Sequence, residues 1–135
     1  METVFGISQS DKRPMYLQIM EQIKQRIVVG DWAEGQPIPS IRQFAADLQV
    51  SVITVKRAYM ELEREGVIVT QQGKGSYVAM TPGLGAKLRE QELKQHLEQV
   101  MRIAAELGIG QKELENKLRE AGDKVSEQIG EKETI

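Results

Sequence analysis

The chain has 135 residues, of which 40% are hydrophobic, and carries 18 Lys and Arg against 20 Asp and Glu. This length and apolar content allow one modest core with an appendage, which excludes wholesale disorder. The absence of Cys excludes disulfides and Cys-based zinc sites. No apolar run approaches the roughly 18 residues of a membrane span, and the first residues, METVFGISQSDKRP, lack the apolar segment of a signal peptide. We therefore expect a cytoplasmic protein with no membrane partner.

The net charge of −2 is unusual for a nucleic-acid-binding protein, because such proteins generally present a basic surface. The distribution of charge is more informative than its sum. The charged residues of positions 40–60 are Arg42, Lys56 and Arg57 with Asp47 as the one acid, and Lys74 stands further along. This pattern indicates a small basic patch in a neutral to acidic chain.

The first predicted element is a helix at about residues 14–29. Pro14 suits a first helical turn, and Gly30 ends the apolar pattern. Between them, apolar residues recur at helical spacing, namely Ile19, Met20, Ile23 and Ile27. A short N-terminal arm precedes this helix, and we expect its Phe5 and Ile7 to pack on the body. The segment DWAEGQPIP, residues 31–39, is predicted to be a loop.

Two helices joined by a tight turn are predicted next. Ser40 and Gln43 fit a capping box, in which Ser40 accepts a backbone hydrogen bond and the Gln43 side chain reaches back. The short helix after Ser40 buries Ile41, Phe44, Ala45 and Leu48. Gln49 and Val50 form the turn. Ser51 caps the second helix, which is predicted to run from Val52 to Glu65.

The second of these helices has two different faces. Its inner stripe is Val55, Ala58, Tyr59 and Leu62, at the spacing of a buried helix face. Ile53, Lys56, Arg57 and Met60 lie on the other side. Gly66 supplies the left-handed residue that ends the helix. A soluble helix thus places two cations beside an isoleucine on its outer face.

A β-hairpin and a helical region complete the chain. The hairpin is formed by residues 67–70 and 76–79 around the Gly-containing turn 71–75. The segment Thr-Pro-Gly-Leu-Gly at 81–85 is a break, so we predict domains at residues 1–80 and 81–135. The fold class is mainly α with a small β-hairpin, in the order of a winged helix-turn-helix followed by a two-helix C-terminal dimerisation hairpin.

Apolar stripes define the two C-terminal helices, which Gly108-Ile-Gly110 separates. The first stripe is Leu84, Leu88, Leu97, Val100, Met101, Ala104 and Leu107, and the second is Leu114, Leu118, Ala121, Val125 and Ile129. All of these except Ala121 and Ile129 are assigned to a dimer contact. The alternative is that the hairpin packs on the N-terminal domain. A two-helix hairpin buries little by itself, so we favour a symmetric homodimer.

A helix, a tight turn and a second helix with outward cations are typical of a helix-turn-helix, and the hairpin adds a wing. In such a motif, Lys and Arg bind phosphates while the start of the second helix reads base edges. Ile53 then contacts a thymine methyl group, Lys56 a base or a phosphate, and Arg57 the DNA backbone. In the alternative reading, Ile53 packs on the wing or a neighbouring helix and the cations are solvated surface charges.

Over about residues 14–79 the chain resembles the GntR superfamily of bacterial transcription regulators. The resemblance rests on these motifs in this order: Tyr16-Leu-Gln-Ile19, Gly30, Gly35, Ile38-Pro-Ser-Ile-Arg42, Val50-Ser51, Thr54-Val-Lys56, Leu62-Glu-Arg-Glu-Gly66 and Gln72-Gly-Lys-Gly75. The short helical C-terminal region resembles the YtrA-type subfamily, because about 55 residues leave little room for a larger effector-binding domain.

The resemblance implies DNA contacts at positions that match the family's motifs. The predicted DNA-binding residues are Ser40, Arg42, Ser51, Val52, Ile53, Thr54, Lys56, Arg57, Gln72, Gly73, Lys74 and Gly75. Many relatives have Arg directly after the capping Ser, where this chain has Val52. A guanine contact from that position is therefore lost, and the operator sequence of those relatives does not transfer.

The function implied is a dimeric repressor that binds a palindromic operator in double-stranded DNA and regulates an operon such as one encoding an ABC transporter. The alternative is a winged-helix module that binds proteins and not DNA, which the neutral charge balance favours. We expect no enzyme activity, cofactor or metal, because the chain lacks Cys and a phosphate-binding Gly-rich loop, and His96, its one His, has no converging ligands. The operator, the regulated genes, the sign of regulation and any effector are not readable from the sequence.

Overall fold

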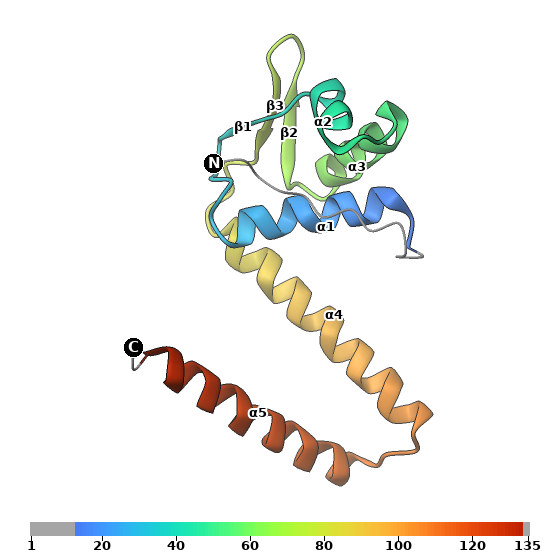
Figure 1. Ribbon diagram of the computed structural model, residues 1–135, viewed down its shortest axis with the longest axis vertical. Coiled ribbons are helices and arrows are strands. Elements are labelled where there is room, and N and C mark those ends of the chain that lie inside the picture. Colours follow the sequence, from blue (N-terminus) through green and yellow to red (C-terminus); the bar gives the residue numbers. More distant parts are fainter. Residues whose placement is uncertain (1–12, 134–135) are drawn as a thin grey trace. The chain divides into compact units, whose positions relative to one another are not determined.

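The computed structural model describes residues 13–133, and the side chains up to residue 130, so the predicted packing of Phe5 and Ile7 lies outside the described residues. The chain divides into two compact units, Met1–Gln91 and Glu92–Ile135. The first contains three helices and a small sheet (Figure 1). Helix α4 (Leu84–Glu106) begins in the first unit and continues in the second, and α5 (Gln111–Glu133) lies within the second.

Helix α1 (Met15–Val28) begins one residue later than predicted, because Pro14 has the extended ψ of 140° and acts as the N-cap. The predicted apolar stripe is buried, with Ile19 and Ile23 completely inaccessible. The helix ends at the C-cap Val29, and Gly30 follows with a φ of 86°, a conformation in which glycine carries no Cβ penalty. The sequence pattern therefore predicted this helix to within one residue at each end.

Helix α2 (Ile41–Leu48) has the predicted Ser40 cap at its start, but the Gln43 side chain binds a different partner from the one predicted. The Oγ of Ser40 accepts a hydrogen bond of 3.1 Å from the backbone N–H of Gln43. The predicted return bond from Gln43 is wrong, since its Nε2 donates to Oδ1 of Asp47 at 2.8 Å. An ionised acceptor one turn further along the helix makes the stronger hydrogen bond. The left-handed Gln49, with a φ of 56°, then makes the predicted tight turn.

Helix α3 (Val52–Arg64) forms the centre of the first unit, packing against both α1 and α2. All four residues of its predicted inner stripe are buried, and Val55, Ala58 and Leu62 are completely inaccessible. The Tyr59 hydroxyl donates to the Pro39 carbonyl at 2.7 Å, and burial raises the pKa of this phenol. Rotation of α3 about its axis is thereby restricted, which determines the side chains that it presents outward.

The sheet has one strand more than predicted. Strands β2 (Ile68–Gln71) and β3 (Gly75–Val78) form the expected antiparallel hairpin, with Gln71 opposite Gly75. The two-residue strand β1 (Pro37–Ile38) pairs with the other edge of β3, in the order β1-β3-β2. The prediction of a loop throughout residues 31–39 is therefore wrong at β1. Proline is tolerated in an edge strand, because one side of such a strand has no ladder partner.

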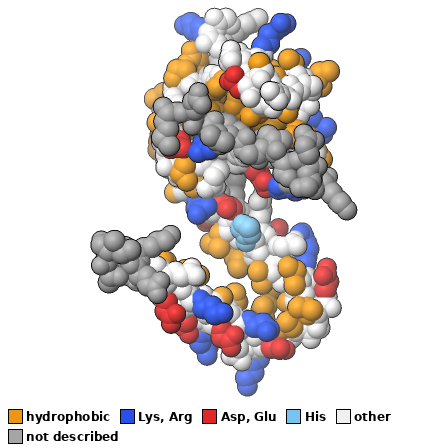
Figure 2. Space-filling model, viewed as in Figure 1, with side chains coloured by type: hydrophobic (Ala, Val, Ile, Leu, Met, Phe, Trp, Pro, Cys, Tyr) orange, Lys and Arg blue, Asp and Glu red, His pale blue; other side chains and the backbone are white. Residues whose placement is uncertain are grey.

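The second unit buries little of its apolar surface. A turn at Gly108, with a φ of 68°, connects α4 to α5, and the Ile109 N–H donates to the Ala104 carbonyl at 2.9 Å. Among the described side chains of this unit, Ala104 alone is buried. Its large aliphatic residues are mostly exposed, and hydrophobic side chains are visible over α4 and α5 in Figure 2. No helix in the described part of the chain is both long enough and apolar enough to cross a membrane.

Candidate nucleic-acid interface

At the start of α3, Ser51 caps the helix and forms hydrogen bonds with Thr54 in the first turn. Ser51 Oγ accepts a hydrogen bond of 3.1 Å from the Thr54 N–H, and the Ser51 and Thr54 hydroxyls lie 2.7 Å apart in a further hydrogen bond. The side chains between them carry no polar atoms. Ile53 is 80% exposed and Val52 is 46% exposed. The alternative reading, in which Ile53 packs on the wing or a neighbouring helix, does not fit this exposure.

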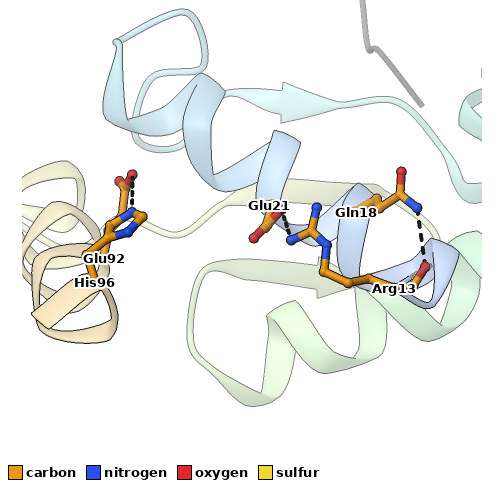
Figure 3. A network of polar contacts seen from close by, with 5 residues as sticks. All are labelled: Arg13, Gln18, Glu21, Glu92 and His96. Atoms are coloured by element: carbon orange, nitrogen blue, oxygen red, sulfur yellow. Dashed lines mark hydrogen bonds and ion pairs between the residues drawn. The ribbon is translucent and has the colours of Figure 1, made fainter. Parts of the chain in front are cut away.

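The Lys and Arg residues of positions 13–80 fall into two groups. Five of the eight Lys and Arg residues in positions 13–80 have bonding partners. Arg13 pairs with Glu21 at 2.7 Å, as Figure 3 shows. Lys24 pairs with Glu65 at 2.7 Å, Arg26 with Asp31 at 2.9 Å and Arg64 with Glu61 at 3.1 Å, while the Arg57 guanidinium lies 3.9 Å from the centre of the Tyr16 ring.

The other three cations are Arg42, Lys56 and Lys74, and all are exposed. Their side chains have no hydrogen bond, ion pair or ring contact with the described side chains, which end at residue 130, or with the described backbone. The charged atoms of these residues are therefore free to bind a ligand of opposite charge. All three belong to the basic patch of four cations predicted from the sequence, and the fourth is Arg57.

Arg57 has a different environment from the other three. Besides stacking on Tyr16, its Nη2 donates to the Tyr16 hydroxyl at 3.4 Å. The side chain thus connects α3 to the first turn of α1, and a structural role accounts for its position. Sequence reasoning missed this contact, because the two residues are 41 positions apart and no local pattern relates them.

The β2–β3 turn holds Lys74 at the tip of the hairpin. The Lys74 N–H donates to the Gln71 carbonyl at 2.9 Å, while Gly73 and Gly75 adopt φ values of 80° and 96°. The Tyr77 hydroxyl donates to the Lys74 carbonyl at 2.9 Å and braces the turn from one side. The backbone at Lys74 is therefore held in place while its side chain extends into solvent.

The predicted DNA-binding residues come from three places. Ser40 and Arg42 lie at the start of α2, residues 51–57 lie at the start of α3, and Gln72, Gly73, Lys74 and Gly75 form the turn of the hairpin. All are exposed except Thr54, which is half-buried. The two serines have a capping role in addition to any contact with a ligand.

The residues predicted for dimerisation fall into three groups. Leu84 and Leu88 are buried in the core of the first unit, and Ala104 is buried in the second. Val100 and Leu114 are partly buried. The exposed members are Leu97, Met101, Leu107, Leu118 and Val125. Sequence reasoning missed the exposed Leu93 and Ile103, although Leu93 precedes Leu97 by one helical turn, a spacing that is visible in the sequence.

His96 lies on an exposed face of α4, with its Nε2 3.7 Å from Oε1 of Glu92 (Figure 3). Among the side chains of residues 13–130, no three of His, Asp or Glu are grouped closely enough to hold a metal ion.

Comparisons with known proteins agree with this geometry. The model of the family described as "Bacterial regulatory proteins, gntR family" matches residues 15–78. The HTH-type transcriptional regulator YhcF of Bacillus subtilis is 34% identical over 102 residues, which are 76% of this chain and 84% of YhcF. The HTH-type transcriptional repressor YtrA of the same organism is 41% identical over 66 residues, which are 49% of this chain but only 51% of YtrA.

Solved structures show the same fold. A GntR family transcriptional regulator from Listeria monocytogenes has a TM-score of 0.70 and 31% identity, covering 82% of this chain and 97% of that chain. YtrA from Sulfolobus acidocaldarius, a GntR-family transcription factor, has a TM-score of 0.52 and 30% identity, covering 90% of this chain and 98% of that chain. The protein thus belongs to the GntR family of bacterial regulatory proteins, as its winged helix-turn-helix and its sequence resemblance both indicate, and is a DNA-binding transcription regulator.

Proposed function

We propose that this chain is a homodimeric repressor that binds a palindromic operator and blocks transcription by occupying it. In each protomer the start of α3 enters the major groove, Arg42 and Lys56 bind phosphates or base edges, and Lys74 binds the backbone beside the groove. Repression as the sign of regulation is supported by the name of the relative YtrA, a transcriptional repressor. Control of an operon encoding an ABC transporter rests on the YtrA-type resemblance alone.

The proposed DNA contact rests mainly on one observation, which is that some cations have side-chain partners and others do not. Ion pairs or a ring contact engage five of the eight Lys and Arg residues in positions 13–80. The three whose side chains have no partner among the described residues lie at the starts of α2 and α3 and in the hairpin turn. A phosphate backbone presents the anions that these positions lack. A net charge of −2 is compatible with this role, because the acids near α3 are used elsewhere. Glu65 binds Lys24, and Glu63 accepts from the Thr70 N–H at 2.8 Å.

The exposed aliphatic residues of α4 and α5 support the dimer. Helices whose apolar stripes face water gain free energy when a second copy covers them, at about 25 cal/mol for each Å² of apolar surface removed. Dimerisation also matches the target, since one recognition helix reads only a few base pairs. Two copies reading half-sites about one DNA turn apart roughly double the binding free energy.

The test is a fluorescence-anisotropy titration of the full chain against DNA from upstream of its own gene, at two salt concentrations. Each phosphate contact contributes about 0.9 to the slope of log affinity against log salt. Replacing Arg42, Lys56 and Lys74 with Glu in both protomers removes up to six contacts, so we expect specific binding to be lost. Lys124→Glu serves as the control. It replaces one exposed cation of α5, and its change of charge equals that of each single replacement in the triple variant.

Two results would contradict the proposal. Affinity that does not change with salt would exclude phosphate contacts as its basis. A triple variant that binds as tightly as the Lys124→Glu control would favour the alternative of a winged-helix module that binds proteins instead of DNA.

A further inference from the structure

The first turn of α3 presents an apolar surface that nothing in the described chain covers. Ile53 and Val52 are exposed by 80% and 46%, although each is a branched aliphatic residue. The core does not require them, because the opposite face of the helix supplies Val55, Ala58, Tyr59 and Leu62. Their exposure therefore costs free energy in water that a bound partner can recover.

The polar groups of the same turn are already bonded. The Ser51 and Thr54 hydroxyls bond one another at 2.7 Å, and Ser51 Oγ also accepts from the Thr54 N–H. Val52 and Ile53 have no side-chain donor or acceptor. Neither a hydroxyl nor an aliphatic side chain offers the paired hydrogen-bonding groups by which side chains usually read guanine or adenine in the major groove.

One base presents an apolar group in the major groove, and that group is the C5-methyl of thymine. We propose that Val52 and Ile53 form a thymine-reading surface, and that specificity at this point of each half-site comes from contact with a methyl group. The inference rests on the proposed operator binding and extends it, because it names the base that the first turn selects.

The charges around these residues favour DNA over an apolar protein surface as the occupant. Lys56 follows Ile53 by less than one turn, is exposed and has no partner among the described residues. A purely apolar partner would strip water from this ammonium group without compensation, whereas DNA places phosphates along the groove beside the methyl groups.

The experiment begins with selection of a consensus duplex by the full chain from a randomised pool. Each thymine of that duplex is then replaced singly by deoxyuridine, which removes only the methyl group. We expect one or two thymines in each half-site at which the replacement weakens binding roughly fourfold, the effect of about one buried methyl group, and roughly fifteenfold when both half-sites are changed.

Ile53→Ala then tests whether this residue reads the methyl group. The variant should fold, since Ile53 is exposed and Ala favours a helix, and it should bind the thymine and deoxyuridine duplexes with nearly equal affinity. Val29→Ala is the matched control, because Val29 is an aliphatic residue of 56% exposure that lies at the end of α1. The control should keep the full discrimination.

The possible results separate the two proposals. If the full chain selects no consensus, both proposals are wrong. If it selects one whose binding is unchanged by every deoxyuridine, or one without thymine in its half-sites, the thymine-reading surface is wrong while operator binding stands. The inference is also overturned if Ile53→Ala and Val52→Ala both still bind the thymine duplex more tightly than the deoxyuridine duplex.

Discussion

The two compact units of this chain use their apolar residues in different ways. In the first unit, the described stripes of α1 and α3 converge on one core with Trp32, Phe44 and the sheet. In the second, Leu97, Met101 and Leu118 all remain exposed. Similar apolar stripes in the sequence are thus buried in the first unit and exposed in the second. The difference teaches that a helix pair has too few neighbours to cover its own stripe, whereas a three-helix unit with a sheet covers nearly all of it.

The largest effect is expected from a cavity in the first unit. Leu62 is completely buried on α3, so Leu62→Ala should lower the free energy of unfolding by about 3 kcal/mol. Urea titration followed by the fluorescence of Trp32, the one tryptophan of the chain, measures this loss. Leu118→Ala, at a half-exposed position of α5, should leave the Trp32 transition almost unchanged. Equal losses in the two variants would remove the contrast between the units.

The next effect concerns association. Leu97→Glu combined with Met101→Glu places two charges on the exposed stripe of α4 and should raise the dimer dissociation constant at least a hundredfold, which is about 2.7 kcal/mol. Sedimentation velocity over a range of concentrations measures it. The near-ultraviolet circular dichroism of Trp32 should be retained, because the first unit has its own core. A wild-type chain that stays monomeric at high concentration would contradict the proposed dimer.

A smaller effect is expected at Tyr59. Tyr59→Phe removes the hydrogen bond to the Pro39 carbonyl and should cost about 1 kcal/mol at neutral pH. Burial raises the pKa of this phenol in the folded state, so the folded protein retains a proton that the unfolded chain releases.

The stability that depends on the neutral phenol is therefore complete below the ordinary tyrosine pKa of about 10 and is lost as pH rises above it. Urea titrations at pH 7 and at pH 11 should show a steeper loss for the wild type than for Tyr59→Phe. Parallel losses in the two proteins would show that ionisation of Tyr59 is not linked to unfolding.

The smallest effect belongs to the Arg57–Tyr16 contact. Arg57→Met retains most of the aliphatic stem but removes the cation, and should lower the free energy of unfolding by about 0.5 kcal/mol, a typical value for an exposed cation–π pair. Affinity for DNA should fall much less than in Lys56→Glu. A loss of DNA binding as large as that of Lys56→Glu, with stability unchanged, would assign Arg57 to the DNA contact that the sequence predicted.

Most elements of the first unit were predictable because their signals are local. Ser40 and Ser51 cap the helices that they precede, and the stripe of α3 is buried as its spacing predicts. The strand β1 was not predictable, since its pairing depends on β3, almost forty residues further along the chain. The direction of the Gln43 side chain was also missed, because the Ser40 N–H on one side and the Asp47 carboxylate on the other compete for its amide, and only the geometry of the helix decides between them.

For the candidate site, the sequence showed which residue types are present, but it did not show which cations are left without a side-chain partner. The capping serines, the aliphatic pair Val52–Ile53 and the glycines around Lys74 all follow from short-range rules of backbone conformation. Which cations remain free depends on contacts such as Lys24–Glu65 and Arg57–Tyr16, each of which joins residues 41 positions apart. Helical periodicity operates over a few residues, so it determined the faces of the helices. The pairing of charges operates through space, so only the tertiary structure decided which of them a nucleic acid can reach.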